Sequence, residues 1–119
     1  MNVGFEGIGR TVATFACKAG EEDTLPAVGD VVTLSASGEV KKSAAKEHFA
    51  GVCVSRNGGY AGVQIRGAIT LPYTGDSAPT VGYNGFTAGS DKAVQVSADG
   101  IKRLTMAVDT QTKAVTILL

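Results

Sequence analysis

The sequence is poor in the residues that most often carry out catalysis or stack on a ligand. It has no tryptophan, three tyrosines, four phenylalanines and one histidine, His48. With so few aromatic rings, the chain is poorly equipped to stack against sugars or bases. One histidine without a thiolate cluster does not make a zinc site of ordinary composition. We interpret His48 as a surface residue in a turn, and a Cys–His pair with Cys17 or Cys53 as the alternative.

Charge is also scarce. Charged residues make up 18% of the chain, and eleven basic residues balance eleven acidic ones. Nucleic-acid-binding proteins cluster lysine and arginine to neutralise phosphates. Here the closest basic pairs, Lys41-Lys42 and Lys102-Arg103, are typical of a solvated strand or turn, so we expect no nucleic-acid partner. A weakly charged surface suits a protein that a partner covers, which is a first indication of assembly.

Long hydrophobic runs are missing as well. No segment approaches the ~18–20 apolar residues needed to cross a bilayer, so we expect no membrane partner. The start, Met1 to Glu6, lacks the basic residues and apolar stretch of a signal peptide, which predicts synthesis in the cytoplasm. Cys17 and Cys53 lack the close spacing of a redox or zinc motif. Two buried, unpaired thiols are the favoured interpretation, and a disulfide is the alternative.

Glycines and acidic residues offer no recognisable ligand motif. The glycines at 4, 7 and 9 precede any strand and open no helix, whereas a dinucleotide-binding loop joins a strand to a helix. The acidic run 21–23 lacks the spaced oxygens of a calcium loop. We therefore predict no catalytic, cofactor-binding or metal-binding residues, and a protein that is not an enzyme.

The elements that are present are short strands. Residues 60–73 alternate with a period of two, the strongest secondary-structure signal in the chain. Asn57-Gly58 before them is typical of a tight hairpin turn. Residues 43–48 have helix-friendly composition and predict a single helical turn. Residues 74–90 are rich in glycine and predict a loop. Further strands are expected at 11–17, 31–34, 39–42, 50–55, 93–96, 104–108 and 114–119.

Seven to nine strands at this spacing predict an all-β fold, a small single-domain β-sandwich or β-barrel. We expect an extended N-terminal arm over 1–9 and one β domain over 10–119. Pro26-Ala27-Val28-Gly29 recurs as Pro79-Thr80-Val81-Gly82. We interpret spans 26–55 and 79–109 as a duplicated strand–turn–strand unit that packs with its copy around one core. Coincidence of turn residues is the alternative.

Several segments together resemble the capsid decoration, or cement, proteins of tailed bacteriophages. The resemblance rests on residues 28–34, 38–40 and 49–52, and on the closing segments 107–110 and 114–119. These segments match the family in the spacing of their strands and turn residues. The longer Gly-rich N-terminal arm is a departure from the simplest family members.

The resemblance implies a β-rich structural virion protein that binds the exterior of the capsid and stabilises contacts between major capsid protein subunits. It also implies self-association, often as a homotrimer, and a place on the outside of the virion. An arm that adds a strand to a neighbour's free edge would suit this role, and we expect residues 1–15 to dock on the capsid or a neighbouring subunit. Alternatives are another virion component, such as a head fibre base or tail accessory, a ligand-binding β-sandwich, and a small hydrolase that uses Cys53 and His48.

Overall fold

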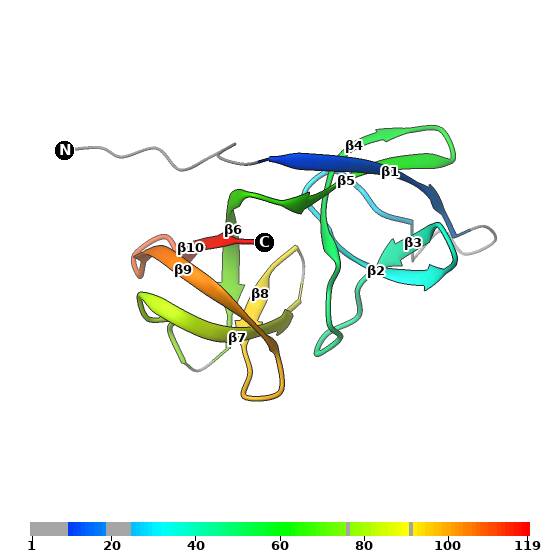
Figure 1. Cartoon of the computed structure of the whole chain (residues 1–119). Coiled ribbons are helices and arrows are strands. Elements are labelled where there is room, and N and C mark those ends of the chain that lie inside the picture. Colours follow the sequence, from blue (N-terminus) through cyan, green and yellow to red (C-terminus); the bar gives the residue numbers. More distant parts are fainter. Residues whose placement is uncertain (1–9, 19–24, 76, 91) are drawn as a thin grey trace.

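The computed structural model describes residues 10–18, 25–75, 77–90 and 92–119, and these form two closed five-stranded barrels (Figure 1). The first barrel contains β1 (Thr11–Cys17), β2 (Val31–Ala36), β3 (Glu39–Lys42), β4 (Gly51–Asn57) and β5 (Tyr60–Arg66). The second contains β6 (Ala68–Thr74), β7 (Gly82–Ala88), β8 (Val94–Val96), β9 (Ile101–Asp109) and β10 (Ala114–Leu118). No helix occurs among the described residues, and the prediction of a small all-β domain is confirmed. The arm predicted for 1–9 lies outside the described residues.

The two barrels have the same topology. Around the first barrel the order is β1-β3-β2-β4-β5, and around the second it is β6-β8-β7-β9-β10. Each contains one parallel pair, β1 with β3 and β6 with β8, and the other neighbours are antiparallel. Strands β1 to β5 are therefore repeated, in order, by β6 to β10.

The turns before β2 and β7 are also alike. Gly29 has a φ of +97° and Gly82 a φ of +115°, a backbone region that favours glycine. A side chain bonds back into each turn: Asp30 Oδ2 accepts from the Ala27 N–H at 2.7 Å, and Asn84 Nδ2 donates to the Thr80 carbonyl at 2.5 Å. The sequence echo thus falls at equivalent places of the two barrels, while the duplication itself stays a prediction.

Buried side chains form two clusters, where the sequence indicated one shared core. Closure of each five-stranded sheet encloses its own interior, and a small barrel is filled by its inward-facing side chains. The first cluster comprises Val32, Val40, Cys53, Ala61 and Val63. The second comprises Val31, Phe49, Val52, Ile69, Leu71, Tyr73, Phe86, Ala88, Val94, Val115 and Ile117. Because Val31, Phe49 and Val52 belong to the first half of the chain, the barrels pack against each other through apolar side chains.

One glycine divides the long alternating segment. Residues 60–73 form two strands, β5 and β6, with Gly67 between them at a φ of +98°. Val63 faces the first cluster, whereas Leu71 faces the second. The alternation therefore correctly predicts β structure. Its inward-facing residues pack in two different interiors, because the chain passes from one barrel to the other at Gly67.

Strand β7 was not expected, since its segment has the glycine content of a loop. Gly85 is in the middle of the strand, and a Cβ there would collide with the carbonyl oxygen of Ser97. The absence of a side chain lets two backbone segments approach closely. In β7 the glycine therefore permits the strand to pack, although in the sequence it resembles a strand breaker.

The segment 43–48 contains the single turn that was predicted, at residues 45–46, but the prediction that this turn is helical is wrong. Lys46 has a φ of +72°, outside the right-handed helical region. Its N–H donates to the Ala88 carbonyl at 2.8 Å, and the Ala88 N–H donates to the Glu47 carbonyl at 2.9 Å. The Glu47 N–H still donates to the Ala44 carbonyl at 3.2 Å, which closes a turn that is not helical. The backbone bonds to β7 attach this segment of the first half of the chain to the second barrel.

Candidate functional site

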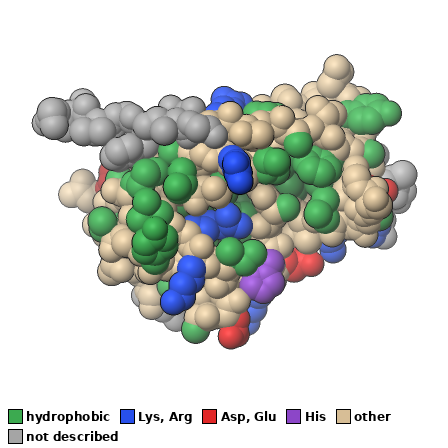
Figure 2. All heavy atoms as spheres, in the orientation of Figure 1, with side chains coloured by type: hydrophobic (Ala, Val, Ile, Leu, Met, Phe, Trp, Pro, Cys, Tyr) green, Lys and Arg blue, Asp and Glu red, His purple; other side chains and the backbone are tan. Residues whose placement is uncertain are grey.

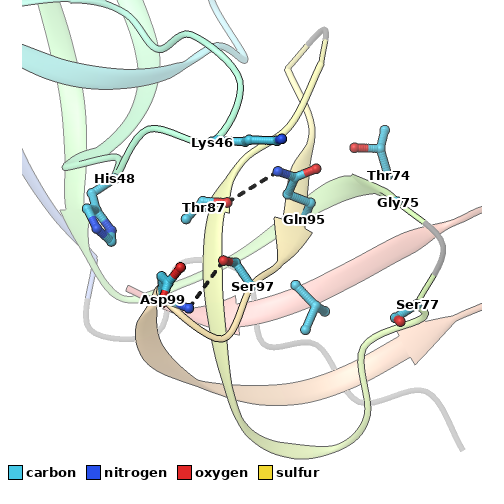
Figure 3. Close-up of a pocket in the computed structure, with 10 residues that line it drawn as sticks. Lys46, His48, Thr74, Gly75, Ser77, Thr87, Gln95, Ser97 and Asp99 are labelled. Atoms are coloured by element: carbon cyan, nitrogen blue, oxygen red, sulfur yellow. Dashed lines mark hydrogen bonds between the residues drawn. The ribbon is translucent and has the colours of Figure 1, made fainter.

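A groove lies where the segment between β3 and β4 crosses the second barrel (Figure 3). It has a volume of about 490 Å³. Lys46 and His48 approach it from that segment, Thr87 from β7 and Gln95 from β8. Its full lining is Lys46, His48, Thr74, Gly75, Ser77, Thr87, Gln95, Val96, Ser97 and Asp99. Nearly all of these side chains are polar, so the groove offers hydrogen bonds and little apolar contact.

Few of the groove's polar groups bond strongly to one another. Gln95 Nε2 donates to Thr87 Oγ1 at 3.4 Å, and Ser97 Oγ accepts from the Asp99 N–H at 3.3 Å (Figure 3). Both are long for hydrogen bonds of these types. The lining mixes the charged side chains of Lys46 and Asp99 with hydroxyl groups, a composition suited to a small polar molecule.

The structure places the nucleophile and base candidates in different surroundings. Cys53 is fully buried in the cluster of the first barrel, and its Sγ donates to the Ser55 carbonyl at 3.3 Å. Burial raises the pKa of the Cys53 thiol, which disfavours the reactive thiolate. His48 is exposed and lines the groove against the second barrel. Cys17 is partly buried against the same cluster as Cys53, and both thiols are free.

Arg103 joins the two barrels. Its guanidinium carbon is 4.6 Å from the centroid of the Phe49 ring, and its Nη2 donates to the Phe49 carbonyl at 3.1 Å. Its Nε is buried without a hydrogen-bond partner, and burial lowers the pKa of the guanidinium below its ordinary value. The interpretation of Lys102-Arg103 as a solvated pair is therefore wrong for Arg103, because its side chain packs against Phe49. Lys102 remains exposed.

A second polar link between the barrels involves Asp30. Its side chain is only 4% exposed, and Lys92 Nζ lies 3.4 Å from Asp30 Oδ1. The same ammonium donates to the Val28 carbonyl at 2.7 Å. Asp30 thus bonds within its own turn and also attracts a cation from the second barrel, so its role is structural.

The outer surface of the second barrel carries an apolar row that crosses three strands. Tyr83 on β7 pairs with Leu104 on β9, and Leu104 pairs with Leu118 on β10. Tyr83 is 74% exposed and Leu118 38% exposed, while Leu104 is half-buried between them. Figure 2 shows hydrophobic side chains gathered over this part of the barrel. Large exposed apolar side chains in contact are typical of a binding surface.

The residues around this row are small or neutral except at the two ends of β9. Ala107 pairs with Thr116, and Asp109 with Ala114, while Lys102 precedes the row by two positions. We call this surface the outer face. It consists of Tyr83 of β7, Lys102, Leu104, Ala107 and Asp109 of β9, and Ala114, Thr116 and Leu118 of β10. Sequence reasoning missed it because apolar residues on both sides of β9 and β10 do not tell which ones face outward.

The described residues contain no group of three or more His, Cys, Asp or Glu side chains able to hold a metal ion. Within the same ranges, no helix is long and apolar enough to cross a membrane.

Comparisons with known proteins identify no relative: no family model matches the chain, and no curated protein and no solved structure is significantly similar to it.

Proposed function

We propose that this chain is a structural virion protein, without catalytic activity, that binds the exterior of a bacteriophage capsid and stabilises contacts between major capsid protein subunits. The outer face is the observation that carries the proposal. It presents Tyr83, Leu104 and Leu118 in one row on a closed barrel. Burial of this apolar surface against another protein removes it from water, which is favourable in free energy. A protein that acts through such a surface binds rather than reacts.

The charge distribution supports the same role. Acidic and basic residues are equal in number, so binding many copies to one shell would not build up net charge on the lattice. When one assembly makes several identical contacts with a lattice, the contacts reinforce one another. Binding that is weak at each contact can then still give high occupancy of the sites on the shell. The proposed partners are the major capsid protein and other copies of this chain, and the proposed location is the capsid exterior.

Closure of the barrels limits how the chain would attach. Residues 11–15 of the segment expected to dock form ladder pairs with β5, so they belong to the first barrel. Residues 1–9 lie outside the described residues, and their role in docking stays a prediction. Side-chain surfaces are therefore the better candidates for attachment among the described residues.

The test uses the full chain and capsid shells of the phage that encodes it. Purified protein is added to expanded and to immature shells, which are then sedimented and analysed for bound protein. We expect saturation at a fixed number of copies per expanded shell and little binding to immature shells. No binding to expanded shells, or equal unsaturated binding to both, would contradict the proposal.

The polar groove favours a second candidate, a ligand-binding β domain. Its volume and its hydroxyl, amide and charged groups suit a small polar molecule such as a sugar. A glycan array and a thermal-shift screen of the purified chain test this. Ligand-dependent stabilisation that is lost in Gln95→Ala, together with no binding to shells, would favour the second candidate over the first.

A further inference from the structure

The outer face contains a large row and a small row side by side. The large row is Tyr83, Leu104 and Leu118, and the small row next to it contains Ala107 and Thr116. Thr116 is only 8% exposed, and its hydroxyl lies 2.8 Å from that of Thr70, so it forms a low part of the surface. The face thus has a ridge beside a depression.

A two-fold rotation about an axis that lies in the plane of the contact, parallel to these two rows and between them, exchanges the rows and turns one face onto the other. The large row of one copy then lies over the small row of the other, on both sides of the axis. We propose that a second copy of this chain covers the outer face through a two-fold contact of this kind. This contact rests on the proposed function and deepens it: the outer faces of two copies cover each other, and the pair attaches to the capsid through its remaining surfaces. Isologous contacts of this type are the commonest in soluble oligomers.

The charges at the ends of the face fit the same arrangement. Lys102 and Asp109 lie seven positions apart on β9, a separation of roughly 23 Å at the usual rise per strand residue. Reversal of the strand direction places Lys102 of one copy near Asp109 of the other. The rotation thus brings opposite signs together at both ends of the face, so charge favours the contact.

A three-fold contact requires a different kind of surface. In a ring of three copies, each copy uses two different patches that complement each other. The outer face complements itself in size and in charge, and so it points to pairs. The homotrimer that the family resemblance implies is thus a competing outcome that the mass in solution decides.

The first measurement is the mass of the full chain in solution, by light scattering and by sedimentation at several concentrations. We expect a species of twice the 12.1 kDa chain mass that dissociates on dilution. A monomer at all concentrations, or a species of three chain masses, would overturn the inference.

The second measurement asks which surface forms the pair. Tyr83→Glu puts a charge in the large row, and we expect it to weaken pairing by roughly tenfold or more, as for a central aromatic residue of an interface. Tyr60→Glu is the matched control, because Tyr60 is 62% exposed on the first barrel. It is expected to leave pairing unchanged. Circular dichroism and thermal melting verify that both variants fold. Equal effects of the two variants would assign the contact to another surface.

The third measurement tests the orientation. Lys102→Glu places like charges at both ends of the contact, and we expect weaker pairing, most of all at low salt. Asp109→Asn in that background removes the repulsion and keeps an oxygen that accepts the turn hydrogen bonds of Asp109. Partial recovery of pairing supports the antiparallel arrangement, and no recovery contradicts it. None of these measurements involves a capsid, so their failure is distinct from failure to bind shells.

Discussion

The guanidinium of Arg103 lies over the ring of Phe49, with its carbon 4.6 Å from the ring centroid. The contact crosses between the barrels, since Phe49 precedes β4 and Arg103 belongs to β9. Phe49 is 2% exposed and packs into the cluster of the second barrel. One side chain therefore fills the second interior, supports a cation and ties the two halves of the chain together.

Replacement of Phe49 by alanine is expected to destabilise the whole domain. The change removes a buried ring and leaves a cavity, for which losses of about 3–5 kcal/mol in the free energy of unfolding are usual. Urea denaturation followed by circular dichroism measures the loss. His48→Ala is the control, because His48 is the exposed neighbour of Phe49 in the sequence. A similar small effect of both variants would show that Phe49 does not hold the barrels together.

The glycine in β7 gives a second test of packing. In Gly85→Ala, the added methyl group meets the Ser97 carbonyl oxygen, which is backbone and moves only with the chain. We expect the free energy of unfolding to fall by about 1–3 kcal/mol, the usual cost of overpacking. Gly59→Ala is the matched control, because a Cβ at Gly59 meets nothing within 4 Å. An unfolding curve of Gly85→Ala that coincides with that of Gly59→Ala would refute the close approach.

Most strands could be predicted because period-two alternation and turn residues are local signals. The strand at 11–17 and the hairpin of β2 and β3 were found in this way, and both are confirmed. The hairpin turn after β4 was found with a shift of one residue. Gly58 and Gly59 form the turn, with Gly58 at a φ of +59°, while Asn57 still belongs to the strand.

What could not be predicted depends on contacts between distant parts of the chain. The two interiors arise because Gly67 turns the chain from β5 to β6, and a single glycine within an alternating run does not reveal that. Lys46 leaves the helical region because Ala88, forty-two positions later, takes its backbone bonds. The groove and the outer face likewise bring together residues that no local pattern connects.

The two cysteines are expected to differ in reactivity. Cys53 is fully buried, and desolvation raises the pKa of its thiol, so alkylation in the native state requires opening of the first barrel. Cys17 is partly exposed and is expected to react first. Mass spectrometry after timed alkylation, with and without urea, identifies the modified residue. Faster modification of Cys53 than of Cys17 in the native protein would contradict its buried position.

Asp109 is expected to contribute to stability at neutral pH through the turn that follows β9. Its Oδ1 accepts from the Gln111 and Thr112 N–H groups at 2.9 and 3.3 Å, and hydrogen bonds from these two residues, first Thr112 and then Gln111, lower the pKa of the carboxyl. A carboxyl whose pKa is lower in the folded state stabilises the protein above its unfolded pKa. That contribution disappears as the pH falls through the folded pKa.

The matched variant is Asp109→Asn, which keeps the accepting oxygen and does not titrate. Both proteins carry Tyr83→Glu, so that self-association does not enter the measurement. We expect the melting temperature of the protein that retains Asp109 to fall more than that of the Asp109→Asn variant as the pH is lowered from neutral to below the ordinary pKa of an aspartate, about 3.9. Asp109 is fully exposed, and so the difference is expected to be small and to shrink in high salt. Parallel melting curves across this pH range would show that the turn does not depend on the charge of Asp109.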